Sequence, residues 1–144
     1  MKHFGPRIAL SGSGAILIGI ASWMMAAPTV FLASSEVIVE HDAGLISEVT
    51  APSGLLLITG SFMILSAIRL QLVSLGLAAG AIVYGSFGFS RFASSYLHGT
   101  PSETLVVVMY FELAIAALLL ALGVRILLSE PSHSLADFRQ EVSQ

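Results

Sequence analysis

The chain has 144 residues, of which 56% are hydrophobic and 10% are charged. An average soluble domain carries about 25% charged residues, so this composition excludes an ordinary soluble domain and indicates a protein of the lipid bilayer. The absence of cysteine excludes disulfides, thiol catalysis and thiolate metal sites. A formal net charge of −3 argues against a nucleic-acid partner, because a phosphate backbone requires a basic face.

Apolar stretches predict an all-α integral membrane four-helix bundle, because a spanning helix needs about 20 mainly apolar residues. We expect transmembrane helices over residues 8–27, 52–69, 72–91 and 101–128, followed by a polar C-terminal tail at 129–144. The whole chain, 1–144, is expected to be one membrane domain. The first stretch follows basic residues, which is also the pattern of a signal peptide. Its length and the lack of a clean A-x-A site favour a retained helix.

Local signals predict where these helices begin and how they connect. Thr50 is a candidate cap for the second helix, with Pro52 in its first turn. The polar break at 69–71 contains no Gly or Pro, which indicates a tight antiparallel hairpin between the second and third helices. Thr100 and Glu103 flank a proline and resemble a capping box at the start of the fourth helix.

The distribution of basic residues predicts the orientation of the bundle. An even number of spans places both termini on one side, together with five basic residues: Lys2, Arg7, Arg69, Arg125 and Arg139. Only Arg91 falls on the other side. Since basic residues collect in cytoplasmic loops, both termini are expected in the cytoplasm and segment 28–51 forms an outer loop. We expect a multi-pass protein of the bacterial inner (cytoplasmic) membrane.

Glu112 is the most informative polar residue at membrane depth. It lies seven residues past Leu105, about 10 Å along the fourth helix. Counting back from Arg91 places Tyr84 at a similar depth in the third helix. We therefore expect Glu112, Tyr84 and Arg91 to form a polar cluster, which Glu48 or His98 could join from the outer loops.

Two interpretations of this cluster remain open. In the first, the cluster is structural: its side chains bond to one another and hold the helices in register, as polar contacts commonly do in membrane bundles. Alternatively, it heads a pocket for a lipid, quinone, isoprenoid or pigment, because ionisable residues inside a membrane often mark function. No dedicated cofactor and no metal site are predicted, since His41 and His98 lack metal-ligand spacing.

Small residues mark two predicted helix contacts. Gly76 and Gly80 form a GxxxG pattern, for which packing within the same chain is the favoured interpretation. Ala114, Ala117 and Ala121 lie on the side of the fourth helix away from Glu112, where a simple bundle would present bulky residues to lipid. They suggest another membrane subunit or a second copy of the chain as a partner, beside the membrane lipids themselves.

The chain resembles a bacterial family of small four-helix membrane proteins, catalogued as domain of unknown function 4345. The likeness rests on a Gly-spaced first helix and on the order of six further features: Ala27-Pro28, Ser47-Glu48-Val49, Ser53-Gly54, Arg91, Gly99-Thr100-Pro101 and Glu112. Thr50 departs from the family pattern, which tends to have Arg there. The resemblance implies the four-helix fold and points to Glu48, Arg91 and Glu112, but it implies no activity. DoxX-type proteins have a similar layout by analogy only.

The sequence best fits a non-catalytic accessory or assembly subunit of a larger membrane complex. That role agrees with the small size, the alanine stripe and the absence of catalytic motifs. A module that binds a lipid, quinone or pigment through Glu112, Tyr84 and Arg91 is the alternative. A membrane enzyme or transporter is less well supported, because few polar groups converge and no inverted repeat of helices is evident.

Overall fold

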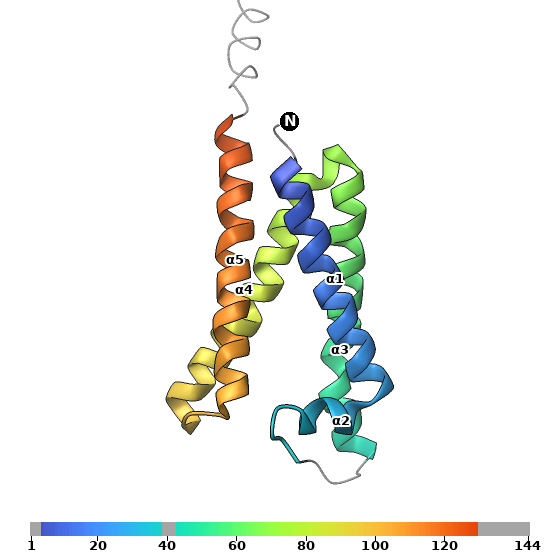
Figure 1. The fold of residues 1–144 in the computed structure, drawn as a ribbon, viewed down its shortest axis with the longest axis vertical. Coiled ribbons are helices and arrows are strands. Elements are labelled where there is room, and N and C mark those ends of the chain that lie inside the picture. The colour runs from blue at the N-terminus through green and yellow to red at the C-terminus, as the bar shows by residue number, and fades with distance from the viewer. Residues whose placement is uncertain (1–3, 39–42, 130–144) are drawn as a thin grey trace, which may run out of the picture.

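The computed structural model describes residues 4–38 and 43–129, and its regular elements are all helical (Figure 1). They are α1 (Phe4–Ala26), α2 (Pro28–Ala33), α3 (Ala43–Ile68), the short 3-10 helix η1 (Leu70–Leu72), α4 (Val73–His98) and α5 (Glu103–Ser129). Helices α1, α3, α4 and α5 are long and apolar enough to cross a membrane. The predicted all-α fold with four such helices is confirmed. Residues Lys2, His41 and Arg139 and the tail beyond Ser129 lie outside the described residues.

The four long helices form two antiparallel pairs, α1 with α3 and α4 with α5. The pairs converge at the end where η1 joins α3 to α4, here called the turn end, and diverge at the opposite α2 end (Figure 1). Burial follows the same gradient. The buried residues of α4 run from Val73 to Gly88, and the ten residues of α4 after Gly88 contribute none. The shared core therefore lies in the turn-end half of the molecule.

Helices α1 and α3 touch through their backbones at two glycines. A Cβ atom added to Gly14 would lie 2.8 Å from the Gly60 carbonyl oxygen, and one added to Gly60 would lie 2.7 Å from the Gly14 oxygen. Small residues permit such close helix contact, and the flanking Leu17 and Met63 are buried. This crossing was not identified from the sequence.

The GxxxG pattern of α4 packs within the chain. A Cβ atom on Gly76 would lie 2.5 Å from the Ser66 Cβ atom of α3. One on Gly80 would lie 2.6 Å from Met63 Cε and 2.8 Å from Leu119 Cδ1, so α3, α4 and α5 meet there. These two glycines therefore let the helix pairs approach each other near the turn end.

The turn end is closed by backbone and side-chain hydrogen bonds. The backbone N–H of Arg69 donates to Leu65 O and that of Leu72 donates to Arg69 O, each at 2.9 Å. This tight α3–α4 connection agrees with the prediction. Arg7 Nε also donates to Ala67 O at 2.6 Å, which supplies a cation to the last turn of α3. However, α3 packs more extensively on α1 than on α4, its neighbour in sequence.

The start of α3 differs from the prediction. The helix begins at Ala43, so Thr50 is an interior residue rather than a cap and Pro52 lies inside the helix. Thr50 Oγ1 donates to Ile46 O at 2.9 Å, and Ser53 Oγ donates to Thr50 O. Both bonds lie in the turns around Pro52, whereas the carbonyl that the missing proline N–H leaves free is that of Glu48.

The predicted outer loop 28–51 is therefore partly helical, because α2 and the first nine residues of α3 fall within it. The proline at position 28 lies in the first turn of α2, where its missing N–H costs nothing. Trp23 of α1 packs edge-on against Phe31 of α2, with ring centroids 5.3 Å apart. This aromatic contact holds α2 across the end of α1.

The other two helix ends also differ from their predicted positions. Helix α4 continues seven residues past Arg91 to His98, and Gly99 follows it with φ +97°. A charged residue ends an apolar stretch, but only the glycine breaks the helix. Helix α5 begins at Glu103, and the carbonyl of Ser102 accepts its first hydrogen bond, from the N–H of Val106. The capping box predicted with Thr100 as N-cap is therefore wrong.

Candidate functional site

The structure brings Arg91 and Glu112 together in an ion pair between α4 and α5. Arg91 Nε donates to Glu112 Oε2 at 3.1 Å. The glutamate side chain is 14% exposed and that of the arginine is 34% exposed. Glu112 therefore lies behind Arg91, and the guanidinium reaches the surface.

A close contact between α4 and α5 positions this ion pair. A Cβ atom on Gly88 would lie 2.8 Å from Leu113 Cγ and 3.2 Å from the Leu113 backbone nitrogen. Gly88 lies one helical turn before Arg91, and Leu113 directly follows Glu112. The missing side chain at position 88 thus allows the two helices to approach where the charged side chains meet.

Tyr84 has a different partner from the one predicted. Its side chain is buried, and its hydroxyl donates to the Ser13 carbonyl oxygen of α1 at 2.7 Å. That bond ties α4 to α1 across the two helix pairs. The Tyr84 hydroxyl therefore bonds within the core, although the residue still lies near enough to Glu112 to interact with it electrostatically. A count along one helix could not reveal a hydrogen-bond partner 71 residues away.

The remaining predicted members of the cluster are exposed. Glu48 lies in the second turn of α3 and His98 is the last residue of α4. The structure records no ion pair between either residue and Arg91 or Glu112 among the residues it describes. Of the predicted group of five, the structure joins Arg91 and Glu112 directly.

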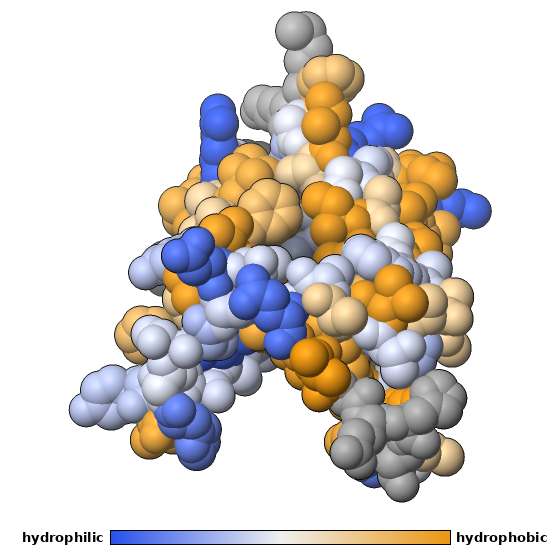
Figure 2. Space-filling view, turned by 60° about the horizontal axis from the view of Figure 1, so that its bottom comes forward, coloured by the Kyte–Doolittle hydropathy of each residue, from blue (hydrophilic) through white to orange (hydrophobic). Residues whose placement is uncertain are grey.

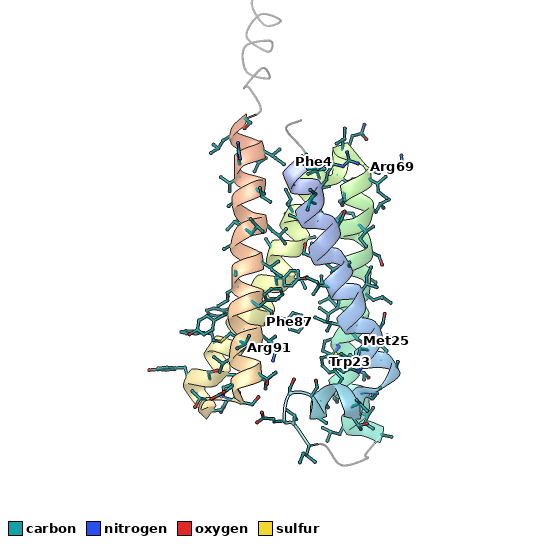
Figure 3. All side chains as sticks on the ribbon, viewed as in Figure 1. Phe4, Trp23, Met25, Arg69, Phe87 and Arg91 are labelled. Atoms are coloured by element: carbon teal, nitrogen blue, oxygen red, sulfur yellow. The ribbon has the colours of Figure 1, made fainter. Side chains whose placement is uncertain are left out.

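A hollow of about 370 Å³ opens beside Arg91 at the α2 end. All its lining residues belong to α4, to the α4–α5 turn and to the first turn of α5, and those of α4 include Phe87, Ser90, Arg91 and Ser94. Figure 3 shows Phe87 and Arg91 pointing from α4 into the space between the helix pairs, with Trp23 on the opposite pair. Figure 2 shows the two pairs as separate lobes with a notch between them at this end.

The two lobes are linked at the α2 end by one long-range hydrogen bond. Ser102 Oγ, at the start of α5, donates to Ser35 O at 3.0 Å. Ser35 follows α2, and the next residue, Glu36, has a left-handed backbone with φ 64°. The segment after α2 thus spans the open end of the notch. The sequence carried no signal for this link, because the two serines lie 67 residues apart in the chain.

The two faces of α5 differ in burial. Leu119 is fully buried, Ala116 packs against the core, and Gly123 approaches Leu77. The opposite face exposes Ala114, Ala117 and Ala121. A shallow recess of about 580 Å³ lies over Ala117 and Ala121.

The polar groups that line the Arg91 hollow are hydrogen-bond donors. The hollow offers a guanidinium and serine hydroxyls, and no carboxylate is among its lining residues. Across residues 4–38 and 43–129, no three His, Asp or Glu side chains gather closely enough to hold a metal ion. The groups present can orient a polar ligand at the edge of an apolar space.

Comparison with known proteins gives a family without an assigned activity. Searches of curated proteins and of solved structures each found no significant match. The family described as a domain of unknown function, DUF4345, matches residues 6–122, which include α1 to α4 except for the first two residues of α1, and most of α5. The Gly14–Gly60 crossing and the Arg91–Glu112 pair both fall within the matched region. The chain therefore belongs to the DUF4345 family.

Proposed function

We propose that this protein is a non-catalytic accessory or assembly subunit of a larger complex in the bacterial inner membrane. The observation that carries the proposal is the open flank of α5. Only Met109 and Leu119 of its 27 residues are buried. Helix α5 packs along α4, touches α1 much less and forms the edge of the bundle (Figure 1).

The recess on this flank has the shape and chemistry for a further transmembrane helix. Ala117 and Ala121 lie one turn apart, and the longer side chains of Leu120, Val124 and Leu128 border them. Without a hydrophobic effect between helices in lipid, association depends on close packing, which small residues permit. The occupant we propose is one transmembrane helix of a different protein.

The proposed orientation places the turn end in the cytoplasm. Arg7, Arg69 and Arg125 lie at or near that end, whereas Arg91 lies towards the α2 end with Glu36, Glu48, Glu103 and Glu112. Basic residues are enriched in short cytoplasmic loops, so the arginines favour this direction. The α2 end then faces outward.

Site-specific photocrosslinking in the native membrane tests the subunit proposal. A photoreactive residue at Leu120 should give one defined crosslink to another membrane protein, and A117L/A121L should abolish it by filling the recess. The control A15L/A26L adds the same bulk to exposed alanines of α1 and should preserve the crosslink. A crosslink between two copies of this chain, or equal loss in both double variants, would contradict the proposed partner.

A second function is favoured by the Arg91–Glu112 pair. We propose that the hollow beside it holds the polar head of an amphiphile, such as a lipid, a quinone or a pigment. A charged pair that served only to join α4 and α5 could be fully enclosed, whereas the arginine is one-third exposed and lines the hollow. We expect a small molecule to co-purify with the natural protein and to be lost from the variant R91Q. Equal retention by the two proteins would contradict this function.

A further inference from the structure

We propose that the hollow beside Arg91 binds the phosphate, or an equivalent oxyanion, of an amphiphile whose apolar tail lies between the two helix pairs. This inference rests on the second proposed function and names the chemistry of the ligand head. It selects an anionic lipid over a quinone or a neutral pigment.

The guanidinium of Arg91 is held in place but retains free donors. Its Nε–H donates to Glu112, which fixes the plane of the group. The two Nη groups carry four further N–H donors, and they have no hydrogen-bond partner among the residues that the structure describes. A planar pair of such donors matches two oxygens of a phosphate. Glu112 thus acts as a positioning residue, and Arg91 would contact the ligand.

Two serine hydroxyls add neutral donors on the same face of α4. Ser90 and Ser94 are four residues apart, exposed, and line the hollow. Within the described part of the chain neither hydroxyl has a hydrogen-bond partner, whereas the nearby Ser95 donates to Arg91 O at 2.8 Å. Because Glu112 already offsets the charge of Arg91, these hydroxyls would stabilise the negative charge of the ligand. A cationic head would find no carboxylate among the lining residues.

The position of Arg91 along α4 fits the head group of a lipid better than the buried ring of a quinone. Eighteen residues separate Val73 from Arg91, which corresponds to about 27 Å of helix. The hydrocarbon core of a bilayer is about 30 Å thick, so a helix that enters at Val73 reaches the opposite boundary near Arg91. Lipid phosphates lie just outside that boundary.

Apolar surface leads from the arginine towards the bilayer centre. Phe87 lies one turn deeper than Arg91 and points into the same space (Figure 3). The hollow falls within the range of about 300–1,000 Å³ that is usual for small-molecule sites. A free anion would use only the polar rim, whereas an amphiphile would also cover the apolar wall.

A matched pair of ligands tests the inference with the full-length protein in a neutral detergent. Phosphatidic acid and diacylglycerol with identical acyl chains differ only in the phosphate. We expect phosphatidic acid to bind about tenfold more tightly or better, given the usual strength of hydrogen bonds to a charged group. Inorganic phosphate, titrated alone, should bind far more weakly than the lipid.

Protein variants locate the effect in the hollow. S90A/S94A removes two hydroxyls that have no partner among the described residues, so it should fold normally and lose most of the preference for phosphatidic acid. The control S11A/S61A removes exposed hydroxyls of α1 and α3 and should keep that preference. R91Q should abolish it, but because R91Q also unpairs Glu112, the double serine variant decides the result.

The outcomes separate this inference from the proposed function beneath it. If diacylglycerol bound as tightly as phosphatidic acid, or if a quinone bound more tightly than both, the hollow would still be a site for an amphiphile. The proposal that it recognises an oxyanion would then be wrong. Equally tight binding of inorganic phosphate would overturn the lipid as its source. An unchanged preference in S90A/S94A would overturn the location. If no amphiphile binds, the inference and the second proposed function both fail.

Discussion

Gly14 and Gly60 place the backbones of α1 and α3 in direct contact, with each carbonyl oxygen occupying the space that a side chain on the other residue would need. The crossing lies within the buried surface of the α1–α3 pair, beside Leu17 and Met63. Any enlargement at either glycine must move a helix backbone, which is less adaptable than the end of a side chain. The mutual contact of Gly14 and Gly60 therefore sets the distance between α1 and α3.

Gly14→Ala should destabilise the protein. Overpacking usually costs about 1–3 kcal/mol, which exceeds or cancels the gain of about 1 kcal/mol that alanine gives in a helix interior. We expect a lower thermal unfolding temperature in detergent. Gly12→Ala is the matched control, because a Cβ atom there meets nothing within 4 Å. If both variants were equally stable, the backbone contact would not limit the packing of α1.

Tyr84→Phe should lower stability and leave ligand binding unchanged. The substitution deletes only the hydroxyl that donates to Ser13 O, and one such bond contributes about 0.5–1.5 kcal/mol. Thermal unfolding would measure the loss, and the phosphatidic acid titration would measure binding. A large loss of binding with unaltered unfolding would return Tyr84 to the ligand site that the sequence predicted.

The Arg91–Glu112 pair should show energetic coupling. E112Q and R91Q each remove one charge, and the double variant should recover part of the combined loss, with a coupling energy of about 1 kcal/mol. Because Arg91 is one-third exposed, its charge can reach water, which keeps the cost of E112Q modest. Additive losses in chemical or thermal unfolding would show that the two side chains do not interact.

Hydropathy and helical rise accounted for much of this structure. The four long helices follow from the length of the apolar stretches. A count along two helices brought Tyr84 to the depth of Glu112, and the expected cluster also included Arg91, which the structure pairs with Glu112. The same count could not show that the Tyr84 hydroxyl bonds Ser13 O, because Ser13 lies on another helix, 71 residues away in the chain. The pattern of apolar and charged residues also could not fix the helix ends, since α4 continues past the charged Arg91 and stops only before Gly99.

Single cysteines test the proposed orientation, since the natural chain has none. Cysteine at Ser35, after α2, should react with an impermeant thiol reagent added to cells with a permeabilised outer envelope and an intact inner membrane. Cysteine at Gln71, in η1, should react only after the inner membrane is opened. Both positions fall outside the long helices α1, α3, α4 and α5. The reverse labelling pattern would invert the topology and place the Arg91 hollow on the cytoplasmic side.

The divergence of the two helix pairs gives the molecule a tapered outline, narrow at the turn end and wide at the α2 end (Figure 1). In a bilayer such a body displaces more lipid area from one leaflet than from the other. The energy of such a body in a bilayer would therefore depend on the difference in lipid packing between the two leaflets.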